Sequence, residues 1–186
     1  MERRSNRAVF LDRDGVINLA VVRGGKPYPP RNLAEMELTP GVSEALVALH
    51  KAGFQLIVAT NQPDVARGTM RRETVDEIHD YLLRTLPIDD IKVCWDANES
   101  NSPCYKPAPG LLLEAATERG IDLKRSFMVG DRWRDVGAGK AAGTFTIFIE
   151  CDYQEPLKDK PDATVRSLVE AVDIILSKSA SRSEPE

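Results

Sequence analysis

Residues 9–17 have the sequence Val-Phe-Leu-Asp-Arg-Asp-Gly-Val-Ile, an apolar run that stops on two carboxylates and a glycine. This pattern predicts a buried strand that delivers Asp12 to the end of a sheet, while Gly15 allows a sharp turn and Asp14 points back towards the same space. Two acids placed in this way can share one metal ion, one acting as nucleophile and the other as proton donor. A solvated turn after the strand is the plain alternative. An EF-hand calcium loop is excluded, because its sixth position requires glycine and here that position is Ile17.

The length and composition of the chain are those of one globular domain. We expect a single domain over residues 1–176 of the 186 and a disordered tail over 177–186. The net charge of −4 and the pI near 5.4 argue against nucleic acid binding. No apolar segment is long enough to span a membrane, so a cytoplasmic protein without membrane partners is expected. The protein is also expected to be a monomer. The three cysteines are too few and odd in number for a disulfide framework, and reduced thiols are expected.

Apolar runs alternate with segments of helical spacing along most of the chain. This alternation predicts an α/β fold, a three-layer sandwich with a central, mostly parallel sheet and helices on both faces. The expected strands are 9–11, 54–59, 91–94, 126–129, 144–149 and 162–165. The expected helices include 41–52, 71–86, one that opens at 106–110 and runs to 119, and 167–176. Segment 18–40 is rich in Gly, Pro and Arg and has no clear period, so it is expected to be a long loop, either a flap over the carboxylate pair or a connector.

Three of the expected strands stop on polar side chains. Asp12 and Asp14 follow the first strand, Thr60 and Asn61 follow the second, and Asp131 follows the fourth. Ligands of parallel sheets bind beyond the carboxyl ends of the strands. These residues are therefore expected to converge, although they lie far apart in the sequence.

Four motifs in this order resemble those of the haloacid dehalogenase-like phosphatases. They are Asp12-x-Asp14-Gly-Val, Thr60-Asn61 after a hydrophobic strand, Lys106-Pro107, and Gly130-Asp131-x-x-x-Asp135. Within that superfamily, Asp-Arg-Asp-Gly, Thr-Asn-Gln, Ala-Arg-Gly and Cys-x-Lys-Pro are most similar to the D-glycero-D-manno-heptose 1,7-bisphosphate phosphatases, with the histidinol-phosphate phosphatases as close relatives. The resemblance covers about residues 8–150 and implies a Rossmann-like fold with a minimal cap. It also implies Mg2+-dependent removal of the 7-phosphate from a heptose bisphosphate, with histidinol phosphate or another phosphorylated metabolite as the alternative substrate.

The residues themselves suit phosphoryl transfer. A phosphate monoester carries nearly two negative charges, and at about 4 Å with an effective dielectric constant near 20 each unit of charge repulsion costs roughly 4 kcal/mol, so the site has to supply cations. An oxygen-only ligand set favours Mg2+, and the expected ligands are Asp12, a backbone oxygen of Asp14, and Asp131. Lys106 supplies a second positive charge. Asp135 is expected to orient Lys106 or a metal-bound water rather than to bind the metal directly.

The resemblance also implies roles for the individual side chains. Asp12 attacks phosphorus to form an aspartyl-phosphate, and Asp14 protonates the leaving oxygen and then deprotonates the water that hydrolyses the intermediate. Thr60 and Asn61 donate hydrogen bonds to the phosphoryl oxygens, where charge is spread in the transition state.

The chain departs from the families it resembles in the loop before the lysine. Those families commonly bind zinc there through Cys-x-His and Cys-x-Cys, whereas the corresponding residues here are Cys94-Trp95-Asp96 and Ser102-Pro103-Cys104. A structural zinc site needs four good ligands, usually Cys or His. Only Cys94 and Cys104 remain with one carboxylate, so zinc is not expected.

The chain also departs from the families at a substrate-binding position: the arginine just before their catalytic lysine, which resembles a contact to a substrate phosphate, is Tyr105 here. Tyr105 and Arg67 are expected to bind the substrate, and Arg67 is the candidate for contacting its distal part. A module that binds a phosphorylated ligand without hydrolysing it is the alternative of another class, although such a protein would be expected to lose the nucleophile first. His50 and His79 are expected on helix surfaces, since neither has a partner at metal-ligand spacing.

Overall fold

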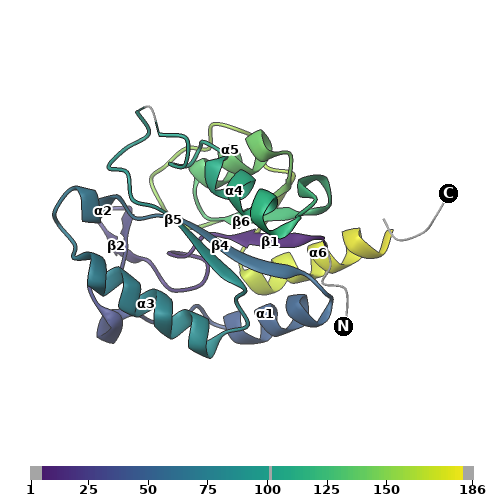
Figure 1. The fold of residues 1–186 in the computed structure, drawn as a ribbon, viewed down its shortest axis with the longest axis horizontal. Helices are drawn as coiled ribbons and strands as arrows, with labels where there is room; N and C mark the ends of the chain where they lie inside the picture. The colour runs from purple at the N-terminus through teal and green to yellow at the C-terminus, as the bar shows by residue number, and fades with distance from the viewer. Residues whose placement is uncertain (1–5, 101, 182–186) are drawn as a thin grey trace.

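A six-stranded parallel sheet organises the chain, as the computed structural model shows for residues 6–100 and 102–181 (Figure 1). The spatial order of its strands is β5-β4-β1-β6-β7-β8, and each neighbouring pair is parallel. The strands are β1 (Ala8–Leu11), β4 (Gln55–Asn61), β5 (Asp90–Cys94), β6 (Phe127–Gly130), β7 (Phe145–Ile149) and β8 (Ala163–Val165). The six predicted strands are thus all present, with small shifts of their ends.

Helices cover both faces of this sheet and make it the middle of three layers (Figure 1). Helices α4 (Gly110–Arg119) and α5 (Trp133–Ala142) lie on one face. The other face is covered by α1 (Val42–Lys51), α3 (Arg72–Thr85) and α6 (Leu168–Ser181). Three short helical segments complete the described helices: η1 (Leu33–Glu35), α2 (Pro63–Ala66) and η2 (Leu123–Arg125). The α/β sandwich predicted from the alternation of strands and helices is confirmed.

The central strand β1 explains why its sequence is apolar at every position. Val9 and Leu11 pack into the core under α1 and α6, while Ala8 and Phe10 pack into a second core under α4. All four side chains are fully buried. A strand covered on both faces loses the alternation of apolar and polar residues that marks a half-exposed strand.

Segment 18–40 differs from the predicted long loop. It contains an antiparallel hairpin of β2 (Val21–Arg23) and β3 (Lys26–Tyr28). The connecting residues, Gly24 and Gly25, have φ values of 57° and 72°, which is the left-handed conformation that a two-residue hairpin turn requires. The Gly-Gly pair was therefore a hairpin signal, although the surrounding proline and arginine residues gave the segment a loop-like composition.

The C-terminal prediction is wrong over residues 177–181, which continue α6 to Ser181 instead of beginning a disordered tail. The preceding part of α6 is anchored in the core by Ala171 and Ile175, both fully buried. An anchored helix extends easily through Ser, Lys and Ala, and the Ser179 hydroxyl donates to the Ile175 carbonyl at 2.8 Å. The rest of the predicted tail, 182–186, lies outside the described residues.

Candidate active site

The polar ends of three adjacent strands meet at one edge of the sheet. Strand β1 lies between β4 and β6, so Asp12 after β1, Thr60 and Asn61 at the end of β4, and Asp131 after β6 are neighbours. A cavity of about 270 Å³ opens at this edge. The predicted residues that line it are Asp12, Asp14, Thr60, Asn61, Arg67, Tyr105, Lys106 and Asp135. Asp131 does not line this cavity and is buried at 2% exposure.

Lys106 is the centre of the charged network in this site. Its side chain is 2% exposed, and its Nζ donates to Asp12 Oδ1 at 2.8 Å, to Asp135 Oδ1 at 2.6 Å and to the Ala59 carbonyl at 2.7 Å. These bonds use all three ammonium protons. Burial alone would lower the pKa of Lys106, but the carboxylates of Asp12 and Asp135 raise it above its ordinary value. The lysine is therefore a fixed positive charge.

Three carboxylates gather around this charge. One oxygen each of Asp12, Asp131 and Asp135 lie within 4.8 Å of one another. Burial and the neighbouring carboxylates raise the pKa of Asp131 well above its usual range, and burial together with Asp135 raises the pKa of Asp12 to about 6 despite Lys106. Among the described residues, neither oxygen of Asp131 has a partner at hydrogen-bond geometry, although the Tyr153 hydroxyl lies near enough to oppose the rise of its pKa. The Asp131 carboxylate packs directly against the backbone of Gly15 (φ 90°), where a Cβ would overlap it, so glycine is required at this position.

This acidic cluster fits a hard divalent cation. Buried carboxylate oxygens without hydrogen bonds are costly unless a cation compensates them, and Mg2+ prefers such oxygen ligands. Asp12 and Asp131 are the predicted side-chain ligands. Asp135 lies in the same cluster, but its Oδ1 accepts from Lys106 and its Oδ2 accepts from the Arg132 backbone N–H at 3.0 Å. Asp135 is thus bonded to Lys106, and its role in orienting the lysine or a metal-bound water stays a prediction.

Asp14 borders the cavity and is held from three directions. The Arg13 guanidinium donates to Oδ1 and Oδ2, each at 2.9 Å from Nη2. Asn18 Nδ2 donates to Oδ1 at 3.0 Å, and Gln62 Nε2 donates to Oδ2 at 3.1 Å. Burial would raise the pKa of Asp14, but Arg13 and these two amides lower it below its ordinary value. The structure therefore stabilises the ionised form of this carboxyl.

Behind Asp14 lies His79, which the sequence placed on a helix surface and which the structure buries at 7% exposure. Its Nε2 is 3.0 Å from Arg13 Nη1. Burial and then the positive charge of Arg13 lower the pKa of His79 to about 3, with only slight opposition from Asp14. The surface prediction failed because α3 turns this polar residue inward, towards a partner 66 positions away. His50, on α1, is exposed as predicted.

The buried neutral histidine predicts a specific loss of stability in acid. The folded pKa is lowered, so the unfolded chain binds the proton first, and the stability is complete above the unfolded pKa near 6.5 and declines as the pH falls below it. Between pH 7 and pH 5 this residue is expected to remove about 2 kcal/mol from the free energy of unfolding. Urea unfolding of His79→Gln at both pH values should show a correspondingly smaller loss. The exposed-site variant His50→Gln should behave like the parent protein, and an equal loss in all three would contradict the assignment.

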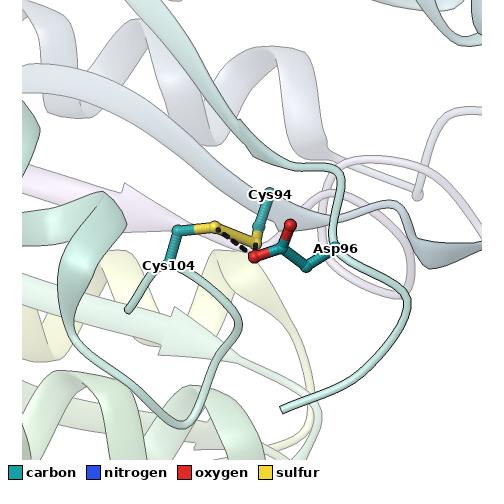
Figure 2. A group of neighbouring side chains, drawn as sticks. All are labelled: Cys94, Asp96 and Cys104. Atoms are coloured by element: carbon teal, nitrogen blue, oxygen red, sulfur yellow. Dashed lines mark hydrogen bonds between the residues drawn. A yellow bond between two sulfur atoms is a disulfide. The ribbon is translucent and has the colours of Figure 1, made fainter. Parts of the chain in front are cut away.

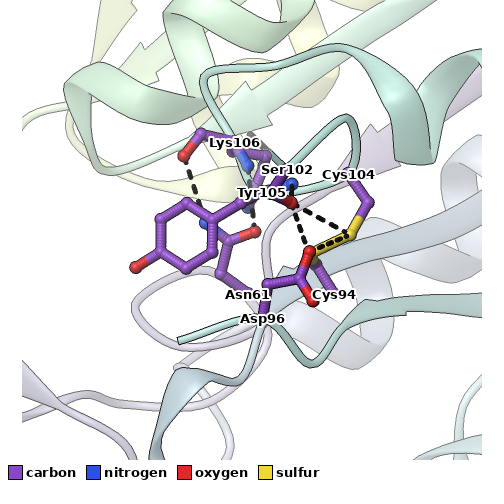
Figure 3. The surroundings of a disulfide bond; sticks show 7 residues. All are labelled: Asn61, Cys94, Asp96, Ser102, Cys104, Tyr105 and Lys106. Atoms are coloured by element: carbon purple, nitrogen blue, oxygen red, sulfur yellow. Dashed lines mark hydrogen bonds between the residues drawn. A yellow bond between two sulfur atoms is a disulfide. The ribbon is translucent and has the colours of Figure 1, made fainter. Parts of the chain in front are cut away.

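Thr60 and Asn61 differ in how they are engaged. The Thr60 hydroxyl oxygen accepts from Gln62 Nε2 at 2.9 Å, so its proton remains for a ligand. The Asn61 amide bonds the backbone of Lys106 at both ends, accepting from its N–H at 3.1 Å and donating to its carbonyl at 3.2 Å (Figure 3). Asn61 thus fixes the loop that carries the lysine and keeps one amide N–H for a phosphoryl oxygen.

The loop before Lys106 contains a disulfide, contrary to the reduced thiols expected for this chain. Cys94 ends β5 and Cys104 lies ten residues later, and their sulfur atoms are bonded (Figure 2). The Asp96 carboxylate lies beside both sulfurs, at 3.8 and 3.6 Å, and the Ser102 hydroxyl also contacts both (Figure 3). Residue spacing could not reveal this pair, because the loop has to fold back before the two cysteines meet. The absence of zinc remains a prediction.

Two arginines at the cavity rim, Arg132 and Arg134, were missed by the sequence analysis, whereas Arg67 was predicted. Arg132 and Arg134 line the cavity from α5 and its N-cap, and Arg67 lines it from the segment after α2. Arg132 forms a two-pronged pair with Glu155 at 2.8 and 2.6 Å, and Arg134 Nη2 pairs with Glu99 at 2.8 Å. The motif Gly130-Asp131-x-x-x-Asp135 specifies only its glycine and two acids, so it gave no signal for the arginines between the acids.

Comparison with known proteins agrees with this geometry. The family model for haloacid dehalogenase-like hydrolases matches residues 31–143. A curated Helicobacter pylori protein, named D-glycero-beta-D-manno-heptose-1,7-bisphosphate 7-phosphatase, is 36% identical over 141 residues, which is 73% of this chain and 78% of the relative. The chain belongs to the haloacid dehalogenase-like hydrolases. The resemblance found in the four motifs is confirmed, and the protein is a phosphoric monoester hydrolase.

Other members of the hydrolase family are similarly close. An Escherichia coli protein of the same name is 37% identical over 155 residues, covering 77% of this chain and 78% of the relative. A crystal structure of a Bordetella bronchiseptica D,D-heptose 1,7-bisphosphate phosphatase, complexed with magnesium and phosphate, matches with a TM-score of 0.78 at 26% identity and covers 92% of this chain and 99% of that one. A HAD-like phosphatase structure from Mesorhizobium loti has a TM-score of 0.74 at 29% identity, covering 94% and 86%. In the described part of this hydrolase, no helix is long and apolar enough to cross a membrane.

Proposed function

We propose that this hydrolase removes the 7-phosphate of D-glycero-D-manno-heptose 1,7-bisphosphate through an aspartyl-phosphate formed on Asp12. The observation that carries the proposal is the buried Lys106, which bridges Asp12 and Asp135 at the base of an open cavity. The names of the Helicobacter pylori and Escherichia coli relatives support the heptose substrate. None of the relatives described above is named for histidinol phosphate.

The first step forms a bond between an Asp12 oxygen and phosphorus while the bond from phosphorus to the sugar oxygen breaks. Within the described part of the chain, the hydrogen bonds to the Asp12 carboxylate come from Lys106 Nζ and the Arg13 N–H, and both reach Oδ1. Oδ2 is therefore the oxygen that is free to attack. The electron pair of the broken bond goes to the sugar oxygen, which takes a proton from the protonated form of Asp14. Because Arg13, Asn18 and Gln62 favour the carboxylate, this is the minor form, and a proton has to bind Asp14 before this step.

The second step returns the enzyme to its starting state. Asp14, now a carboxylate, accepts a proton from a water molecule, whose oxygen attacks phosphorus and releases phosphate from Asp12. The ionised form that this step requires is the form that Arg13, Asn18 and Gln62 stabilise. Lys106 and the Thr60 hydroxyl offset charge on the phosphoryl oxygens without reorganising.

Asp12, Asp131 and the backbone oxygen of Asp14 are proposed to bind Mg2+, which supplies positive charge against the phosphoryl oxygens when bound. The two unpartnered oxygens of Asp131 support this assignment. The magnesium in the Bordetella bronchiseptica structure is a further argument by similarity.

Removing one metal ligand is predicted to make the metal-free protein more stable. Asp131→Asn eliminates a buried carboxylate that lies beside Asp12 and Asp135, so the free energy of unfolding without metal should rise by about 1–3 kcal/mol. The parent protein should gain about 2.7 kcal/mol at a Mg2+ concentration one hundred times its dissociation constant, and the variant should gain far less. Thermal unfolding after chelator dialysis, with MgCl2 or with NaCl of equal ionic strength, measures both effects. The same Mg2+-induced shift in both proteins would refute the ligand assignment.

The substrate is tested with a panel of phosphate esters. Phosphate release with Mg2+ should be measured for both anomers of the heptose 1,7-bisphosphate, for the heptose 7-phosphate, for other sugar phosphates and for histidinol phosphate. A preference for one bisphosphate anomer is the expected result, with Arg67 and the neighbouring rim arginines as contacts for the distal phosphate. Equal, weak hydrolysis of all esters would contradict the heptose assignment, and no hydrolysis of any ester would favour a binding module.

A further inference from the structure

His79 has no place in the reaction described so far, yet it contacts the residue that holds Asp14. It lies on α3, does not line the cavity, and is buried at 7% exposure. Its Nε2 is 3.0 Å from Arg13 Nη1. The polar atoms of a buried imidazole are normally hydrogen-bonded. Within the described part of the chain, Arg13 is the hydrogen-bond partner of His79 Nε2.

The chemistry of the two groups fixes the direction of this hydrogen bond. A guanidinium has donors only, so His79 Nε2 must accept, and the neutral ring therefore carries its proton on Nδ1. The lowered pKa of His79 agrees with a ring that stays neutral. His79 is thus an acceptor for one arm of Arg13.

Arg13 is fully buried and faces His79 and Asp14 with different nitrogens. Nη1 points to His79, while Nη2 and Nε reach the Asp14 carboxylate at 2.9 and 3.2 Å. Because the guanidinium is planar and rigid, an acceptor at Nη1 determines the plane in which Nη2 and Nε lie. Without that acceptor, the buried Nη1 would be left unsatisfied, and the guanidinium would turn to find another partner.

We propose that His79 is a positioning residue, which orients the proton-transferring carboxyl of Asp14 at the cavity through the Arg13 guanidinium. This inference rests on the proposed function, since it requires Asp14 to protonate the leaving oxygen. If so, loss of His79 should slow hydrolysis most for those esters whose leaving group has to be protonated as it departs. Alkyl phosphates, which release a basic alkoxide, depend on the acid, whereas p-nitrophenyl phosphate releases a stable phenolate and depends on it much less.

The test compares His79→Leu, which has no acceptor, with His79→Gln, whose amide oxygen restores one. For each variant kcat/KM is measured with p-nitrophenyl phosphate and with the best alkyl phosphate of the panel, because kcat/KM reports the step in which the leaving group departs. In His79→Leu the value for the alkyl ester should fall about 10-fold more than the value for the aryl ester, since small displacements of a catalytic group have effects of this order. His79→Gln should restore the parent ratio. An unchanged ratio in His79→Leu, whether or not both rates fall, would overturn the inference.

Three further variants make the result decisive. Asp14→Asn should show the same split between the two esters to a larger extent, and if it does not, the proposed role of Asp14 fails as well as the inference. A split in Asp14→Asn without one in His79→Leu refutes the inference alone. Ile78→Val, a fully buried neighbour on α3, controls for general loosening and should leave the ratio unchanged. If His79→Leu does not fold, His79→Phe replaces it, because the ring fills the site of the imidazole without offering an acceptor to Arg13, and the same split is expected.

Discussion

Asp12→Asn is expected to reduce phosphate release by at least about 10⁴-fold while the protein stays folded, because the amide is a poor nucleophile and a poor metal ligand. The change hardly alters the volume of the side chain. The amide oxygen can still accept from Lys106 Nζ, which now lies 2.8 Å from Asp12 Oδ1, so the buried lysine keeps a partner. Initial rates with Mg2+ on an aryl phosphate and on the best sugar phosphate measure the activity, and circular dichroism with thermal unfolding measures the fold.

The Asp12 prediction needs a control for the loss of any aspartate. Asp80→Asn, at an exposed position of α3, changes the net charge equally and should retain full activity. Activity of Asp12→Asn within 100-fold of the parent protein would refute the aspartyl-phosphate on Asp12. Loss of the cooperative unfolding transition would instead show that Asp12 contributes mainly to stability.

The strands were predictable because each has a strong local signal. Phe10 and Leu11 belong to an apolar run that only a strand buried on both faces explains, and the alternation with helices then requires parallel pairing. The hairpin was missed because β2 and β3 are three residues each, and strands this short have no measurable period. Only the Gly24-Gly25 pair marked it.

The site residues that could be predicted are those that lie at the carboxyl ends of strands. Asp12 and Asp131 follow from topology, since adjacent parallel strands bring their carboxyl ends together. The partners of Arg13 were not predictable, because His79 comes from a helix whose rotation depends on how α3 packs. The Cys94–Cys104 bond likewise depends on the path of a loop, and residue type alone favoured free thiols.

Lys106→Met is expected to lower both the stability of the protein and its rate of phosphate release. Methionine preserves the length and apolar stem of the side chain but removes the charge that lies between Asp12 and Asp135. Breaking a buried ion pair by removing one partner costs about 3–5 kcal/mol, because the remaining charges are left uncompensated. Asp131 adds a third carboxylate to Asp12 and Asp135, which increases their repulsion once the lysine charge is gone. Urea unfolding without metal should therefore show a loss of stability in this range. Phosphate release should fall at least about 100-fold, since a fixed charge against the phosphoryl oxygens is lost.

Lys92→Met provides the matched control, because Lys92 also pairs with carboxylates, those of Asp90, Glu114 and Glu118, but both glutamates are solvent-exposed. Its cost should be at most about 1 kcal/mol. The double variant Lys106→Met with Asp135→Asn separates charge from packing. Removing one carboxylate should recover part of the stability that Lys106→Met loses, because fewer negative charges remain buried together, yet it should recover no activity. If the double variant is less stable than Lys106→Met alone, the lysine stabilises the site through its packing and hydrogen bonds, and electrostatic compensation is not its main contribution.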